Sequence, residues 1–209
     1  MKKQQNQAGF TIIELSIATT VFSILLLLSL GAVARIGQMY YKGVITSQTQ
    51  DVSRLVGSEI AQSIQLNSGT INNTPVVPAG NTGQFCVGDI LYTYVIDKPL
   101  AGTQLHVLWA DAVSADAVSN CVFAGPQTRT LTNAYPGGTN GRELLSPNMR
   151  LSKLDVKKLG STSLYSLDMG IVFGDDTVLT STHDQCLSDT SSSQFCSVVN
   201  LNTTVKKRL

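Results

Sequence analysis

The fold is decided by residues 9–34, which read GFTIIELSIATTVFSILLLLSLGAVA. No charged residue occurs from Leu15 to Ala34, and a membrane-spanning helix needs about 20 apolar residues in succession. Glu14 stands at the start of this run, where a carboxylate at membrane depth costs about 2.5–3.5 kcal/mol. The stretch therefore predicts a membrane helix whose Glu14 needs a partner in the membrane or in an assembly.

This junction resembles the type IV prepilin signature, in which a Gly-Phe bond is followed by a hydrophobic triplet and a glutamate. The resemblance covers residues 1–66 and rests on Lys2, Lys3, Gly9, Phe10, Thr11 and Glu14. It implies that a prepilin peptidase cleaves after Gly9 on the cytoplasmic side of the inner membrane and N-methylates Phe10. Cationic flanks stay cytoplasmic, which fits this orientation. It also implies that Glu14 serves assembly by pairing with the terminal amine of a neighbouring subunit.

Three other interpretations compete for the same segment. Ala32-Val33-Ala34 is a plausible cleavage site for a secretory signal peptide, but the apolar run is longer than the 7–15 residues usual for such signals. An uncleaved anchor leaves Glu14 and the Gly-Phe step unexplained. A buried core helix of a soluble protein is disfavoured by the length of the run. The prepilin interpretation accounts for all of these residues.

A helix is predicted from Phe10 to Leu66, with residues 10–36 in the membrane and an amphipathic second half. The second half carries an apolar stripe at helical spacing, opposite a polar side. The stripe contains Ile45, Val52, Val56, Ile60 and Ile64, widened by Leu55 and Leu66, and the polar side contains Gln48, Asp51, Arg54, Ser58 and Gln62. No proline occurs before Pro75, and Gly31 stands where many pilins have a helix-bending proline.

The expected organisation is a leader at residues 1–9, a helix at 10–67 and a β-rich head domain at 68–209. Residues 72–83 are predicted to form a loop, and strands are expected at 84–87, 90–96, 105–109, 121–123, 149–157, 163–173 and 195–205. Lys158–Ser161 is typical of a hairpin turn, and so is Gly174–Thr177. The predicted fold class is α+β, with the long helix packed on an antiparallel sheet as in pilins.

The end of the chain carries a second resemblance. Residues 199–208 read VNLNTTVKKR and are similar to the last strand of large minor pilins of the PilW and pseudopilin-J kind. This similarity favours a minor subunit over the major one. The basic residues Lys206, Lys207 and Arg208 are interpreted as a solvated tail or strand end, with contact to DNA or an acidic partner as the minority alternative.

Cys86, Cys121, Cys186 and Cys196 allow three disulfide pairings, and an exported protein is expected to form disulfides. We expect Cys186 to pair with Cys196, and Cys86 with Cys121. The first pair resembles the C-terminal disulfide-bounded loop of many pilins. No C-x-x-C motif occurs, so zinc and thioredoxin-like chemistry have little support.

Catalytic and metal-binding motifs are scarce in the sequence. Neither His106 nor His183 belongs to a recognisable nucleophile motif, and we expect His106 and Trp109 to pack within the fold. Tyr135 is likewise assigned to packing, with a ligand surface as the alternative. Calcium is a minor alternative for Asp168, Asp175, Asp176, Asp184 and Asp189, which lack the EF-hand pattern. We therefore expect no enzyme activity, no cofactor and no metal.

The sequence thus predicts a structural subunit of a type IV pilus or related filament. Its expected partners are the prepilin peptidase, the pilus assembly platform, other pilin subunits and the inner membrane. It would reside in the inner membrane before assembly and in an extracellular or periplasmic filament afterwards. A type IV pilus, a competence pilus and a type II secretion pseudopilus all remain open, and nucleic acid is a partner only for DNA uptake. The alternative is a tethered or secreted disulfide-bonded binding domain without filament assembly.

Overall fold

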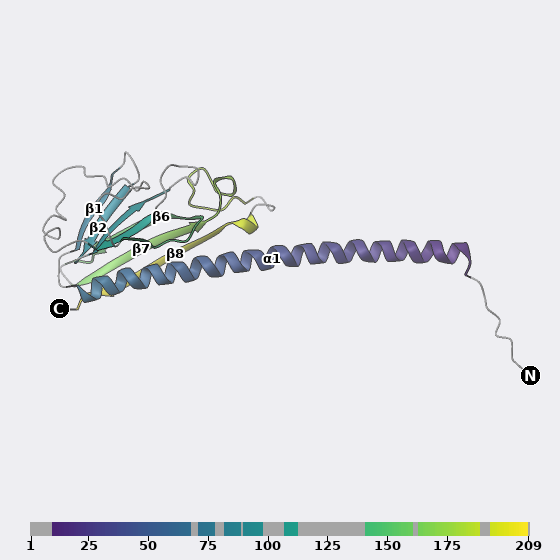
Figure 1. Cartoon of the computed structure of the whole chain (residues 1–209), viewed down its shortest axis with the longest axis horizontal. Helices are drawn as coiled ribbons and strands as arrows, with labels where there is room; N and C mark the ends of the chain where they lie inside the picture. Colours follow the sequence, from purple (N-terminus) through teal and green to yellow (C-terminus); the bar gives the residue numbers. More distant parts are fainter. Residues whose placement is uncertain are drawn as a thin grey trace, which may run out of the picture. The chain divides into compact units, whose positions relative to one another are not determined.

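The computed structural model of the chain has a long helix, α1 (Ile12–Leu66), near its N-terminus (Figure 1). The structure describes residues 10–67, 71–77, 82–88, 90–97, 107–112, 141–160, 163–188 and 193–208. The chain forms two compact units, Met1–Tyr41 and Lys42–Leu209. Residues of α1 belong to both units, and the helix ends at Leu66 as predicted but begins at Ile12 instead of Phe10.

The second half of α1 packs through one face into the core of the second unit. Its buried residues follow the helical period and are Ile45, Thr49, Ser53, Val56, Gly57, Ile60, Ser63 and Ile64. Most of the predicted stripe is therefore confirmed. The small residues among them let neighbouring strands approach the helix closely. At Gly57, for example, an added Cβ would lie only 2.2 Å from Cδ2 of Leu201.

Leu55 and Leu66 were predicted to widen this stripe, and that prediction is wrong. Leu55 is 61% exposed and Leu66 is 65% exposed, whereas Val56 and Ile60 are fully buried. With 3.6 residues per turn, Leu55 and Leu66 lie on the same side of the helix as polar Gln48 and Gln62. The buried face is thus narrower than the apolar pattern suggests.

A five-stranded antiparallel sheet supplies part of the head. Its strands follow chain order: β1 (Ile71–Val77), β2 (Thr82–Val87), β3 (Ile90–Val95), β4 (Leu108–Ala112) and β5 (Arg142–Glu143). β1 occupies the stretch predicted as a loop, so that prediction is wrong. Among the described strands it is an edge strand that pairs with β2 alone, and its register shifts between Thr74 and Val77. An edge strand with a bulge tolerates a proline, here Pro75, which sequence rules treat as a strand breaker.

A three-stranded antiparallel sheet completes the head. It contains β6 (Met149–Lys158), β7 (Leu164–Phe173) and β8 (Ser197–Lys206), in that order. These strands confirm the predicted ones to within two residues at each end. The register pairs Met149 with Phe173 and Phe173 with Ser197. A parallel bridge between Ile96 and Leu151 joins the two sheets, so the head has two connected sheets where a single one was expected.

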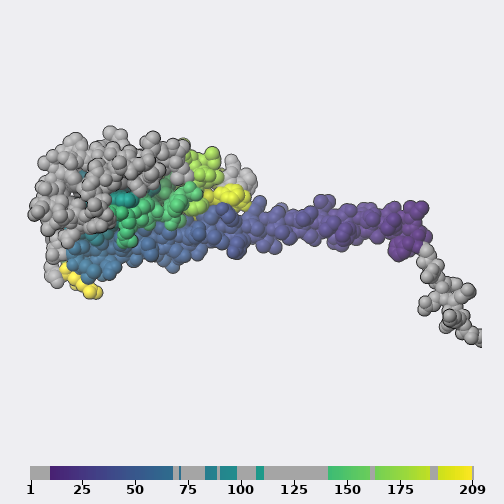
Figure 2. All heavy atoms as spheres, in the orientation of Figure 1, coloured from purple at the N-terminus to yellow at the C-terminus, as the bar shows by residue number. Residues whose placement is uncertain are grey.

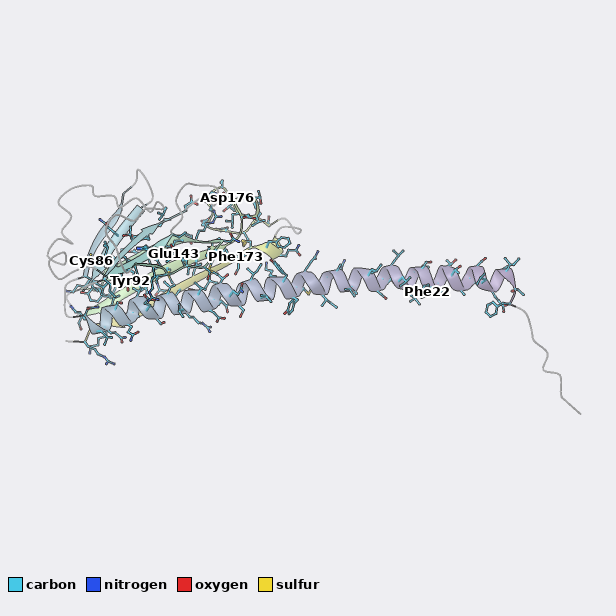
Figure 3. The ribbon with its side chains drawn as sticks, viewed as in Figure 1. Phe22, Cys86, Tyr92, Glu143, Phe173 and Asp176 are labelled. Atoms are coloured by element: carbon cyan, nitrogen blue, oxygen red, sulfur yellow. A yellow bond between two sulfur atoms is a disulfide. The ribbon has the colours of Figure 1, made fainter. Side chains whose placement is uncertain are left out.

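The core of the second unit combines the buried face of α1 with residues from both sheets. Tyr92 of β3 is fully buried, and its hydroxyl shares a 2.8 Å hydrogen bond with Ser63 of α1 (Figure 3). The ring of Phe85 stacks on Tyr92 with centroids 4.7 Å apart. Leu151, Leu167, Met169 and Ile171 are fully buried beside them in the same cluster. The helix and the sheets therefore share one hydrophobic core.

The buried tyrosines predict how this core responds to alkaline pH. Burial raises the pKa of both Tyr92 and Tyr94 to about 12. An unfolded tyrosine ionises near pH 10, so the stabilisation is complete below pH 10 and is lost as the pH rises towards about 12. The loss should be of the order of 2–3 kcal/mol per tyrosine. Urea unfolding between about pH 9 and pH 12 should show a smaller decline for Tyr94→Phe than for the unaltered chain. An equal decline in the free energy of unfolding for both proteins would contradict the raised pKa of Tyr94.

Candidate functional site

The first turn of α1 is closed by a reciprocal pair of side chains. Thr11 precedes the helix, and its hydroxyl and its backbone N–H both donate to Oε2 of Glu14, at 2.9 and 3.1 Å. The backbone N–H of Glu14 donates in return to Oγ1 of Thr11, at 3.3 Å. This is a capping box, which satisfies backbone donors that have no partner within the helix. It explains why the helix begins at Ile12.

The capping box also places a negative charge where a helix favours one. The N-terminus of a helix carries a partial positive charge, so the Glu14 carboxylate is stabilised there. Phe10 lies just outside the helix and is 79% exposed. Gly9 lies outside the described residues, so the structure gives no geometry for the predicted cleavage bond. Phe10 and Thr11, which follow the predicted cleavage bond, are nevertheless exposed and lie close to the Glu14 carboxylate.

From Leu15 to Ala34 the helix of the first unit carries no charged residue, and hydroxyl groups are its only polar side-chain groups. All residues from Phe10 to Tyr41 are exposed, among them Ile12, Phe22 and Leu27 (Figures 2 and 3). An 18-residue window of α1 reaches a mean hydropathy of 2.3, and none of it is buried. A helix without a polar face either spans a membrane or is enclosed by other protein. The segment is therefore suited to single-pass anchoring in a membrane.

The hydroxyl groups of this apolar helix are satisfied within the helix itself. Ser16 donates to the carbonyl of Ile12, Thr20 to that of Ser16 and Ser23 to that of Thr19, at 2.8–3.1 Å. Thr19 and Ser29 make similar bonds to Ser16 and Leu25. A polar group without a partner is costly in hydrocarbon, and these bonds remove that cost. Composition alone counts these residues as polar and so misses their compatibility with lipid.

Several positions raised by the sequence either pack within the fold or lie outside the described residues. Trp109 is half-buried, and a Cβ added to Gly141 would lie 2.1 Å from its Nε1. His106, Cys121, Tyr135 and Asp189 all lie outside the described residues. Cys86 is disulfide-bonded, and its expected partner Cys121 is among these undescribed positions.

The connection between β7 and β8 is closed by a disulfide. Cys186 and Cys196 are bonded, with Cα atoms 5.7 Å apart. The connection begins with a short 3₁₀ helix, η2 (Asp176–Val178), at the predicted Gly174–Thr177 turn, and ends in another, η3 (Ser193–Phe195). A small cluster of Val172, Val178, Leu179 and Cys196 forms its own apolar centre. The connection is thus a structured unit on the sheet.

Three of the five aspartates named above as a minor alternative for calcium binding have other partners in the structure. Asp168 pairs with Lys153, and Asp176 pairs with Arg150. Asp184 accepts hydrogen bonds from Thr182 and Thr180, which lower the pKa of its carboxyl. Within the described ranges, no three His, Cys, Asp or Glu residues are grouped so as to hold a metal ion.

One polar network was missed by sequence reasoning. Arg150 is fully buried and donates to Asp176 at 2.6 Å and to the carbonyl of Gly174 at 2.8 Å. Nδ1 of His183 contacts Asp97 at 2.5 Å, and its Nε2 lies 4.0 Å from Asp176. The network ties the disulfide-closed connection to β6 and to the end of β3. Its members are far apart in sequence and match no motif, so the sequence offers no signal for it.

The comparisons with known proteins bear on the N-terminal segment. A family model described as "Prokaryotic N-terminal methylation motif" matches residues 4–30. This match supports a type IV pilin-like family. The matched residues include the predicted cleavage bond, the capping box and the greater part of the apolar run. Members of a pilin-like family are structural subunits. The comparisons with curated proteins and with solved structures gave no match.

The capping box predicts that two variants of Glu14 will behave differently. Glutamine serves in a capping box as glutamate does, whereas alanine does not. Glu14→Ala and Thr11→Val should each cost about 1 kcal/mol at the first turn, which corresponds to about fivefold faster amide exchange in that turn. Glu14→Gln should exchange nearly as slowly as the unaltered chain. Hydrogen exchange of the micelle-bound protein measures this, and equal rates for the Gln and Ala variants would contradict the capping role.

Proposed function

We propose that this chain is a structural subunit, specifically a minor one, of a type IV pilus or related filament. The observation that carries the proposal is the apolar helix preceded by the methylation motif and by an ionised residue in its first turn. The helix of the first unit has no polar face, and no described residue of its own unit covers it. Lipid before assembly and neighbouring subunits after assembly would provide that cover.

Processing would convert the membrane precursor into an assembly-competent subunit. A prepilin peptidase would cleave between Gly9 and Phe10 and methylate the new amine of Phe10, as the match to residues 4–30 suggests. The new amine would carry a positive charge close to Glu14 in the sequence. In a filament, the amine of one subunit and the Glu14 of a neighbour can then neutralise each other within an apolar environment.

Glu14 would therefore have two roles that differ in what they require. The capping box needs an acceptor oxygen, which a neutral amide also provides. Pairing with an amine in an apolar assembly needs a negative charge, because an unpaired buried charge costs several kcal/mol. The two requirements can be separated experimentally by changing the charge without removing the acceptor.

The head would project from the filament and determine its partners. The end of strand β8 and the two residues after it read Thr-Thr-Val-Lys-Lys-Arg, which resembles large minor pilins and favours a minor subunit. The prepilin peptidase, the assembly platform and other pilins are the partners that this role requires. The filament itself is assigned only as type IV pilus, competence pilus or type II secretion pseudopilus.

The alternative function is a tethered binding domain that never enters a filament. It is favoured by the disulfide-closed connection and the well-packed head, which are equally suitable for a stand-alone exported domain. In that case the apolar helix acts only as an anchor, and a neutral residue at position 14 lowers the cost of insertion. Glu14 variants therefore discriminate between the two functions.

The test compares incorporation of three forms of the chain into filaments sheared from its native cells. The unaltered chain should appear in the sheared fraction. Glu14→Gln, which keeps the cap and loses the charge, should fall at least tenfold in that fraction while its level in the membrane is unchanged. Thr11→Val, which weakens the cap and keeps the charge, is the matched control and should still assemble. Normal incorporation of Glu14→Gln, or absence of the unaltered chain, would contradict the proposal.

A further inference from the structure

A cavity lies where the end of α1 meets the end of β8. Its volume is about 510 Å³, and Gln65, Lys206, Lys207 and Arg208 line it. Figure 2 shows this end of the chain in yellow at the surface of the second unit, beside the last turns of α1. Among the described residues that line it, three are cations that follow one another in the sequence. The site is therefore strongly basic in a chain whose formal net charge is only +1.

The backbone that carries these cations is fixed by hydrogen bonds to neighbouring elements. The backbone N–H of Lys207 donates to the carbonyl of Ser163, at 2.9 Å, and that of Arg208 donates to the carbonyl of Gln65, at 3.3 Å. The segment is thus fixed on one side to the start of β7 and on the other to the last turn of α1. The interpretation of these residues as a strand end is confirmed, because β8 ends at Lys206. Because the backbone is already ordered, ligand binding costs less conformational entropy.

Lys206 and Arg208 differ from several cations elsewhere in the head in how their charge is paired. Arg142, Arg150, Lys153 and Lys157 form ion pairs with Glu59, Asp176, Asp168 and Asp155. Among the residues that the structure describes, no acidic side chain pairs with Lys206 or Arg208. The end of α1 offers only a partial negative charge of about half an elementary charge. Lys206 and Arg208 therefore bring positive charge to the cavity that no acidic side chain of the described residues neutralises.

We propose that this cavity binds a compact ligand that carries two or more phosphate groups. A guanidinium matches phosphate in a bidentate way, and lysine ammonium groups act as point charges beside it. The amide of Gln65 can donate or accept a further hydrogen bond. The volume falls within the 300–1,000 Å³ typical of small-molecule sites. A nucleic acid needs a longer basic stripe, and this cluster is confined to the end of one strand.

The test measures binding of inorganic pyrophosphate to the full chain in neutral detergent micelles, by isothermal titration at low salt. The unaltered chain should bind pyrophosphate more tightly than inorganic phosphate. Lys206→Gln/Arg208→Gln should weaken pyrophosphate binding at least tenfold, because two of the three cations are lost. The matched control Arg54→Gln/Lys153→Gln removes the same charge from exposed sites elsewhere and should change the affinity less than twofold. Gln65→Glu keeps all three cations and should also weaken binding, since it adds an anion to the cavity.

The source of the phosphate groups is resolved by a second measurement. Binding to phosphatidylcholine vesicles that contain a lipid with a multiply phosphorylated headgroup, and competition by pyrophosphate, would assign the site to a lipid headgroup. Binding of pyrophosphate without vesicle binding would assign it to a free ligand, and both results support the proposal. It is overturned if pyrophosphate does not bind, or if the control variant loses as much affinity as the cavity variant. It is also overturned if only DNA binds, with an affinity that rises with oligonucleotide length. None of these outcomes depends on filament assembly.

Discussion

A helix that is apolar on every side must be surrounded by something other than water, and this constraint governs the first unit. The hydrophobic effect is roughly proportional to the apolar area removed from water, and here nearly all of that area is exposed. The internal bonds of Ser16, Thr20 and Ser23 show that the polar groups of the segment are already satisfied. Lipid and neighbouring apolar helices are therefore both compatible with it, as a subunit that leaves a membrane for a filament requires.

In the second unit the same helix is covered on one face by the rest of the unit. There it has one buried face, and that face is built from small residues and branched aliphatic residues at helical spacing. Gly57 makes room for Leu201 of β8, and Ser63 supplies the partner that the buried hydroxyl of Tyr92 needs. Anchoring and support of the head are thus encoded in successive parts of a single element.

Much of this arrangement was predictable because it depends on local patterns. The apolar run, the buried positions of α1 and strands β6–β8 follow from periodicity, which a single sequence records directly. The failures have physical causes. Leu55 and Leu66 count as apolar wherever they point, and β1 is an edge strand whose proline is tolerated only because one side is unpaired. The site was predictable as residue types, but the capping geometry of Thr11 and Glu14 and the His183 network depend on contacts in space.

The central claim is that Phe10 becomes the methylated first residue of a filament subunit. Mass spectrometry of the N-terminal peptide, from protein isolated from its native cells, tests it most directly. The account predicts a chain that begins with N-methylated Phe10 and retains Glu14. A chain that begins at Arg35, after the Ala32-Val33-Ala34 site, would show that the helix is a removed secretory signal. That result would contradict the account.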